Sequence, residues 1–131
     1  MDKAVSALLA DLSERGLLDQ TIVLCGGEFG RTPKVMWESP WNGGRGHHCY
    51  AFSYLVAGGG FIGGKVLGKT DNLGEKVIER PVYPWDLTAS VYSLMGIDPK
   101  SKLVHPREGE IPLLPGLGGN LSGGILTEIM K

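Results

Sequence analysis

Two short apolar runs, each closed by a cluster of glycines, constrain the fold of this chain more than any other feature. Residues 21–25 (TIVLC) precede two glycines, and residues 50–57 (YAFSYLVA) precede three. Glycine makes up 21 of the 131 residues, which is more than twice the usual share of about 7%. Short apolar runs that end in glycine turns predict strands buried on both faces, as in a parallel sheet.

Helices are predicted on either side of these strands. Leucine and valine recur at helical spacing before Gly16, which predicts an amphipathic helix over the first 15 residues. A second apolar stripe between Pro84 and Gly96 predicts another helix. The pattern of residues 61–82 predicts two short strands joined by a turn near residues 71–74. Residues 125–130 predict a final turn. Helix, buried strand and glycine turn in succession favour an α/β fold.

The charge and length of the chain exclude several classes of protein. Thirteen basic and fourteen acidic residues give a net charge of −1, which excludes a basic nucleic-acid footprint and a polybasic membrane-binding surface. No apolar run reaches the ~18 residues of a membrane span, and the first 16 residues are too charged for a secretory signal. The length predicts one domain over residues 1–131.

Glu28 is the first candidate for chemistry. It follows the first predicted strand within the sequence GGEFGR, and ligands of open α/β sheets bind outside the carboxyl ends of the strands. Arg31 supplies a cation in the same turn. The alternative is a surface turn in which Glu28 and Arg31 form a solvated ion pair that contributes little stability.

His47 and His48 are the second candidates, since they lie directly before the second predicted strand. Adjacent side chains on an extended strand point to opposite sides, so both bind one ion only if the glycine-rich backbone bends. Together with Glu28 they predict a divalent-metal site, because imidazole and carboxylate ligands suit zinc or manganese better than calcium. The alternative is that one histidine packs while the other is exposed.

Arg31 and Arg45 are candidates for binding substrate, because two guanidinium groups near glycine turns can hold a phosphate or a sulfate. Alternatively, each arginine anchors its loop to a carboxylate. Trp37 and Trp41 lie in the intervening loop and either line a substrate pocket or pin the loop onto the core. Two cysteines do not make a disulfide framework. Both are expected to be buried like small apolar side chains, with a ligand role for Cys49, directly after the histidines, as the alternative. No motif of a known nucleophile is present, so the catalytic residues stay unassigned.

Three segments carry a resemblance to a known family. They are GGEFGRTP, NGGRGHHCYAFSYLVAGGGFIGGKVLGKTDNLGE and DLTASVYSLMGIDP, in that order. In these segments the chain resembles the carboxyl-terminal part of the bacterial, sulfatase-like proteins called domain of unknown function 1501, of the alkaline-phosphatase-like superfamily. The resemblance implies an α/β sandwich with a mostly parallel sheet, of which this chain is the C-terminal portion only, and the remaining N-terminal part of the same domain as its partner.

The resemblance also implies a divalent-metal site at strand ends that acts on phosphate or sulfate esters. By position, Glu28 matches the acidic ligand, and His47 and His48 match the later histidine motif. The family usually has Asp where this chain has Gly46, which removes one possible ligand. The nucleophile and the other ligands are then expected upstream of Met1, and export to the periplasm or the outside is implied by the resemblance alone.

Two functions follow as hypotheses. The first is a metal-dependent hydrolase of phosphate or sulfate esters, with a small-molecule or glycan ester as substrate, in which this piece is inactive alone. The second is a non-catalytic binding or structural module, motivated by Trp37, Trp41, Tyr50 and Tyr54, because aromatic residues are enriched at recognition surfaces. In either case, uncovered sheet edges predict poor solubility of the isolated chain.

Overall fold

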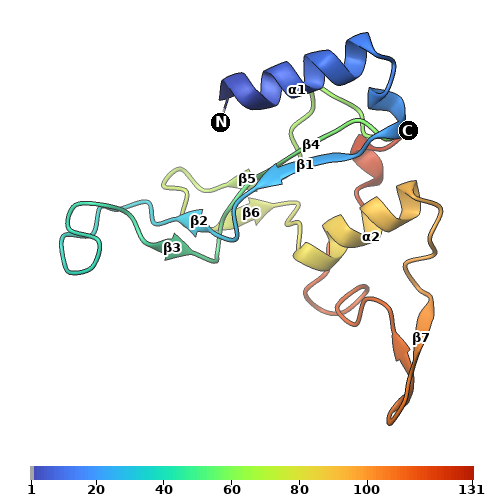
Figure 1. Ribbon diagram of the computed structural model, residues 1–131. Helices are drawn as coiled ribbons and strands as arrows, with labels where there is room; N and C mark the ends of the chain where they lie inside the picture. The colour runs from blue at the N-terminus through green and yellow to red at the C-terminus, as the bar shows by residue number, and fades with distance from the viewer. Residues whose placement is uncertain (1) are drawn as a thin grey trace.

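The computed structural model describes residues 2–131, which form two α-helices and four two-stranded sheets (Figure 1). The helices are α1 (Asp2–Glu14) and α2 (Pro84–Leu94), and single 3₁₀ turns cover Leu18–Gln20 and Thr127–Ile129. The strands are β1 (Val23–Gly26), β2 (Gly30–Arg31), β3 (His47–His48), β4 (Tyr54–Ala57), β5 (Lys69–Thr70), β6 (Val77–Glu79), β7 (Lys102–His105) and β8 (Gly109–Pro112). Both predicted helices and the predicted pair of short strands, β5 and β6, are therefore confirmed.

The predicted alkaline-phosphatase-like α/β sandwich with a mostly parallel sheet is wrong. β1 pairs with β4 in antiparallel register, with Val23 opposite Ala57, and the other three sheets are also antiparallel pairs. Leu24 and Leu55 are 46% and 43% exposed, so the β1–β4 pair is not buried on both faces. An apolar run that ends in glycines is compatible with either strand direction, because the pairing partner is set by contacts distant in the sequence.

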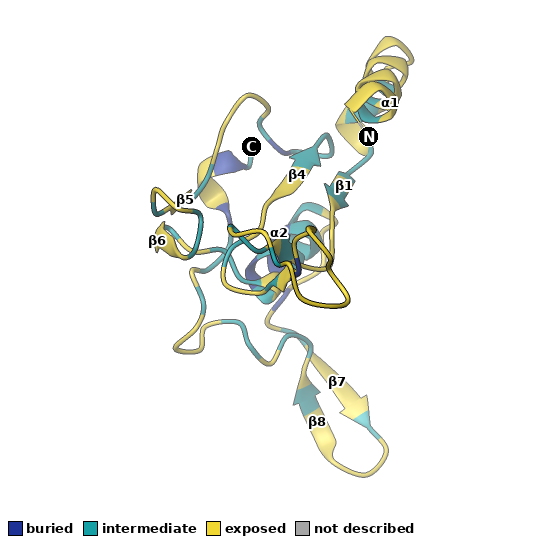
Figure 2. Ribbon diagram, turned by 90° about the vertical axis from the view of Figure 1, so that its left-hand side faces the viewer, coloured by how far each residue is buried: buried dark blue, intermediate teal, exposed yellow. Residues whose placement is uncertain are grey.

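The core lies where α2 meets the C-terminal segment. Phe61, Leu126 and Ile129 form the buried cluster. Half-buried apolar side chains surround it: Ile22, Val56, Leu67, Val82, Leu87, Val91, Leu94 and Met130. Figure 2 shows the buried positions gathered around α2 and the chain's C-terminal end. The core is therefore small for a chain of 131 residues.

A buried carboxylate joins α2 to the C-terminal segment. Asp86, in the first turn of α2, is fully buried. Its two carboxylate oxygens accept hydrogen bonds from the backbone N–H groups of Tyr83, Gly123 and Gly124 and from the hydroxyl of Ser122, at 2.6–3.1 Å. A buried carboxylate needs such donors to offset the loss of its hydration, so Asp86 fixes the position of residues 122–124.

Two further contacts hold the same segment. The buried hydroxyl of Ser90 donates to the carbonyl of Asp86 and accepts from the N–H of Leu126 at 2.9 Å. Arg80 forms a two-point ion pair with Glu128, with N···O distances of 2.5 and 3.0 Å. The hydrogen bond from the Arg80 guanidinium lowers the pKa of Glu128 to about 2. The last ten residues are thus attached to the core by polar contacts as well as by apolar packing.

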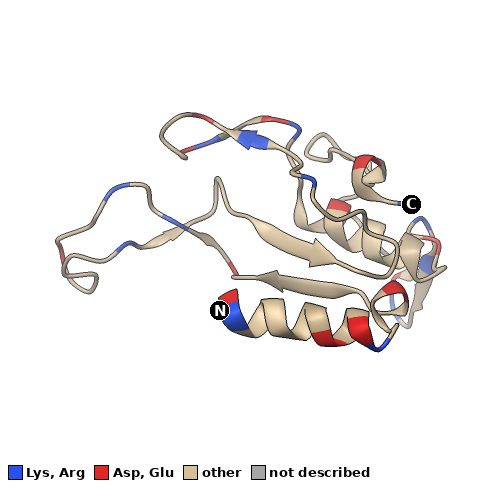
Figure 3. Cartoon of the chain, turned by 90° about the horizontal axis from the view of Figure 1, so that it is seen from above, with Lys and Arg blue, Asp and Glu red and all other residues tan. Residues whose placement is uncertain are grey.

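Two elements lie outside this core. No residue of α1 is buried, although α1 runs beside β1 in Figures 1 and 3. The β7–β8 hairpin projects from the rest of the molecule in Figure 2, and Val104 at its centre is 86% exposed. Within residues 2–131, neither helix has the length and apolar character needed to cross a membrane.

Candidate functional site

The β2–β3 hairpin brings together three side chains that the sequence analysis selected. Arg31 on β2 lies directly opposite His47 on β3, and Glu28 lies in the turn that leads into β2. The Nε2 atom of His47 is 2.8 Å from Oε1 of Glu28, and Nη1 of Arg31 is 3.6 Å from the same oxygen. An acid, an imidazole and a guanidinium group therefore meet on one side of the hairpin.

This cluster is open to solvent. The side chains of Glu28, Arg31 and His47 are 57%, 46% and 62% exposed. A backbone hydrogen bond lowers the pKa of Glu28, against an opposing desolvation effect, and the charges of Arg31 and His47 lower it further. The carboxylate is therefore ionised at neutral pH and is available to a cation from solvent.

The spacing of Glu28 and His47 is close to that of two ligands of one metal ion. Two ligands about 2.1 Å from a tetrahedral zinc ion lie about 3.4 Å apart, so this pair needs to separate by only about 0.6 Å. Both side chains are exposed and can make that movement by rotation. Within residues 2–131, however, no group of three or more His, Cys, Asp or Glu side chains is arranged to hold a metal. The hairpin therefore offers two ligands, which is half of a usual zinc site.

His48 is placed on the other side of the hairpin from this pair. Its Nε2 atom donates to the carbonyl of Glu75 at 2.9 Å, and its ring contacts the ring of Tyr50 edge-on. The backbone remains extended at His47 and His48, so their side chains diverge, as the alternation of a strand requires. The structure thus brings His47 to Glu28 and uses His48 to attach β3 to the turn before β6. The expectation that both cysteines are buried is wrong, because Cys49 is exposed beside the histidines and Cys25 is only half-buried.

The two candidate arginines differ in their surroundings. Nη1 of Arg31 donates to the carbonyls of Phe29 and Gly30, at 3.1 and 3.0 Å, so this guanidinium stabilises the turn and retains other N–H groups for an anion. Arg45 is exposed and takes part in none of the ion pairs found among residues 2–131. Figure 3 shows basic residues on both arms of the loop that joins β2 to β3.

The loop between β2 and β3, residues 32–46, explains the absence of a side chain at residue 46. Gly46 is buried, and a Cβ atom there would lie 2.9 Å from Nε1 of Trp41 and 3.0 Å from Sδ of Met36. The family that the sequence resembles usually has aspartate at this position. An aspartate side chain does not fit here unless the indole of Trp41 is displaced. Trp41 thus packs inside the loop, in the space that a side chain at residue 46 would need.

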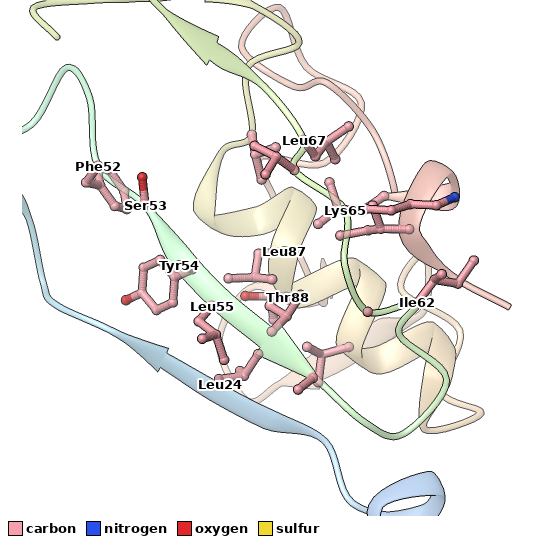
Figure 4. A pocket seen from close by; sticks show the side chains of 18 of the residues that line it. Leu24, Phe52, Ser53, Tyr54, Leu55, Ile62, Lys65, Leu67, Leu87 and Thr88 are labelled. Carbon is pink, nitrogen blue, oxygen red and sulfur yellow. The ribbon is translucent and has the colours of Figure 1, made fainter. Parts of the chain in front are cut away.

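A largely apolar hollow of about 1090 Å³ lies beside the hairpin. It is bounded by β4, α2 and the segment of residues 62–67, and Figure 4 shows Tyr54, Leu55 and Leu87 on its walls. Glu28 is among its lining residues, so the acidic group of the hairpin borders the hollow. Neither this hollow nor the buried Asp86 could be predicted from the sequence, because both depend on contacts between segments far apart in the chain.

A family model described as a protein of unknown function (DUF1501) matches residues 1–121 of the chain. No curated protein and no solved structure matches. The match covers the β2–β3 hairpin, the loop that joins its strands and α2.

Proposed function

The chain belongs to the DUF1501 family, and from this premise we propose that its β2–β3 hairpin contributes to a divalent-metal site for the hydrolysis of phosphate or sulfate esters. Glu28 and His47 are the two metal ligands that this chain supplies. The convergence of Glu28 and His47 to 2.8 Å is the observation that carries the proposal.

Zinc and manganese fit these ligands better than calcium, because one ligand is an imidazole nitrogen and the other a carboxylate oxygen. The bound metal supplies Lewis-acid stabilisation of negative charge on the ester oxygens. Further ligands come from water or from groups outside the described residues. His48 is not among them, because its side chain lies on the other side of the hairpin, where its Nε2–H donates to the backbone carbonyl of Glu75.

Arg31 and Arg45 bind the anionic group of the ester in this proposal. Arg31 is fixed by the carbonyls of Phe29 and Gly30, so its position costs little further conformational entropy when an anion binds. Arg45 is exposed and lies on the other arm of the loop, just before β3. The catalytic nucleophile is not assigned to a residue of this chain.

Hydrolysis of 4-nitrophenyl phosphate and 4-nitrophenyl sulfate tests the proposal. The intact protein is stripped with a chelator and then assayed with and without added zinc or manganese. We expect activity only with metal, and its loss in Glu28→Gln and His47→Ala. Glu75→Gln is the matched control, because only its backbone carbonyl contacts the hairpin. Equal activity with and without metal contradicts the proposal.

A structural role of the same hairpin is the second candidate. Glu28, Arg31 and His48 all form contacts within the hairpin or to its neighbouring turn, which is what a non-catalytic module needs. In that case His47→Ala lowers the melting temperature. The wild type and His47→Ala both contain no bound metal. A metal-loaded wild type and a metal-free His47→Ala protein exclude this second candidate.

A further inference from the structure

The loop of residues 32–46 presents an aromatic ring that the folding of the chain does not use. Trp37 is 78% exposed, the highest value among the aromatic residues that the structure shows as exposed. The other two tryptophans have internal roles. Trp41 packs against Gly46, and Trp85 donates its indole N–H to the carbonyl of Leu121 at 2.9 Å. Because so little of its ring is buried, Trp37 contributes little to folding through the burial of apolar area.

The loop is held in a defined shape by its own backbone. Met36 and Gly44 form a bridge, with a hydrogen bond of 2.9 Å from the N–H of Met36 to the carbonyl of Gly44. Thr32 and Gly46 are joined by two further bonds at the base of the loop, of 2.9 and 3.1 Å. A loop with this shape already formed loses little conformational entropy when it binds a ligand.

The ring of Trp37 touches the backbone of its own loop. A Cβ atom at Gly43 would lie 3.0 Å from the indole, so the backbone of Gly43 packs against the ring. With 78% of Trp37 exposed, most of the ring is open to solvent. A flat, accessible indole suits a ligand with a broad apolar face, and the C–H face of a pyranose sugar is such a surface.

A cation lies in the same loop as this ring. Trp37 and Arg45 directly follow Met36 and Gly44, the two residues of the bridge that closes the loop. Arg45 is exposed, and Lys34 adds a second cation to the loop against the single acid Glu38. The ligand that matches both features is a sugar that carries an anionic substituent.

We infer that residues 32–46 form a carbohydrate-binding arm, in which the exposed ring of Trp37 stacks on a pyranose ring and Arg45 binds a sulfate or phosphate group on that sugar. A sulfated or phosphorylated sugar would then be the substrate class for the proposed ester hydrolysis. Only the role of the sulfate or phosphate as the hydrolysed group rests on that proposed function. Stacking by Trp37 does not require the metal.

Binding of three polymers to the intact protein tests the inference. Dextran sulfate carries both sugar and sulfate, unsubstituted dextran carries sugar alone, and polyacrylate carries negative charge alone. Titration calorimetry is expected to show the tightest binding for dextran sulfate. Trp37→Ala is expected to weaken that binding roughly tenfold, in line with the loss of a tryptophan anchor. Arg45→Ala is expected to weaken dextran sulfate binding and to leave dextran binding unchanged.

Val104→Ala is the matched control, because Val104 is an exposed apolar residue on the β7–β8 hairpin, outside the loop. It is expected to bind dextran sulfate as the wild type does. Equal affinity of Trp37→Ala and wild type for dextran sulfate overturns the inference. Absence of binding to both polysaccharides overturns it in favour of a protein contact at Trp37. Polyacrylate binding as tight as that of dextran sulfate overturns it in favour of charge alone.

The same variants separate this inference from the proposed function. Trp37→Ala is expected to retain the metal content of the wild type, because Glu28 and His47 lie outside the loop. If the wild type contains no metal and Trp37→Ala still loses dextran sulfate binding, the proposed hydrolysis fails and the carbohydrate arm stands. If metal-dependent activity is confirmed and Trp37→Ala binds normally, only the carbohydrate arm fails.

Discussion

Replacing Asp86 by Asn is expected to destabilise the protein severely, because four donors face its buried carboxylate. The donors are the N–H groups of Tyr83, Gly123 and Gly124 and the hydroxyl of Ser122. The amide of Asn has nearly the same volume, but its oxygen can satisfy only half of these donors and its NH₂ group faces the others.

The magnitude follows from the number of lost bonds. A hydrogen bond to a charged group contributes about 1.5–3 kcal/mol, so the loss of two gives about 3–6 kcal/mol. Total stabilities of domains are about 5–15 kcal/mol, so Asp86→Asn removes a large part of the free energy of unfolding. The C-terminal segment is expected to detach first, because residues 122–124 depend on this carboxylate for their position.

Urea unfolding followed by circular dichroism measures the loss, and limited proteolysis locates it. Asp98→Asn is the matched control, since exposed Asp98 accepts one hydrogen bond, from the N–H of Lys100. The control is expected to lose no more than about 1.5 kcal/mol, and to show no new cleavage in residues 121–131. A loss below about 1 kcal/mol in Asp86→Asn refutes the reasoning.

Three further predictions concern the C-terminal ion pair, the loop and the exposed strands. Because the pairing with Arg80 lowers the pKa of Glu128 from 4.5 to about 2, the carboxylate stabilises the folded state above about pH 4.5 and loses that effect as the pH falls toward 2. Glu128→Gln is therefore expected to be less stable than wild type at pH 7, by a difference in urea midpoint that shrinks between pH 4.5 and 2; a difference that is constant with pH contradicts this. Gly46→Asp is expected to displace Trp41, which a rise in acrylamide quenching of tryptophan fluorescence detects, and unchanged quenching shows that the loop accommodates the side chain. The isolated 131-residue chain is expected to self-associate and to bind a hydrophobic dye, because β1 and β4 expose apolar side chains; a monodisperse monomer in light scattering shows otherwise.

The positions of most elements could be predicted from the sequence. The glycines at residues 16, 58–60 and 96 all have positive φ angles, which most residues avoid, so the chain turns where the sequence analysis placed turns. The apolar stripes that precede Gly16 and Gly96 correctly predicted α1 and α2. These signals are local, and local signals determine where an element begins and ends.

The pairing of the strands could not be predicted in the same way. The run of residues 21–25 is equally apolar whether its partner runs parallel or antiparallel, and only the contact with β4 decides. The β7–β8 hairpin was missed because its turn is stabilised by a side chain. Nδ1 of His105 accepts from the N–H groups of Arg107 and Glu108, and nothing in the composition of that segment marks this contact.

In the candidate site, too, the residue types could be predicted from the sequence but their contacts could not. Glu28 and His47 were predicted as ligands, and the structure places them in contact. His48 was predicted as a ligand as well, but the alternation of side chains along β3 points it away from His47. The role of Gly46 could be noticed only as a missing aspartate, whereas its cause is the indole of Trp41 against it.

Zinc titration of three proteins tests the central claim most directly. Calorimetry is carried out on chelator-treated wild type, His47→Ala and His48→Ala under identical conditions. If Glu28 and His47 share a cation, the wild type and His48→Ala bind zinc with similar affinity, and His47→Ala binds it at least tenfold more weakly. Equal zinc affinity in His47→Ala and wild type contradicts the account.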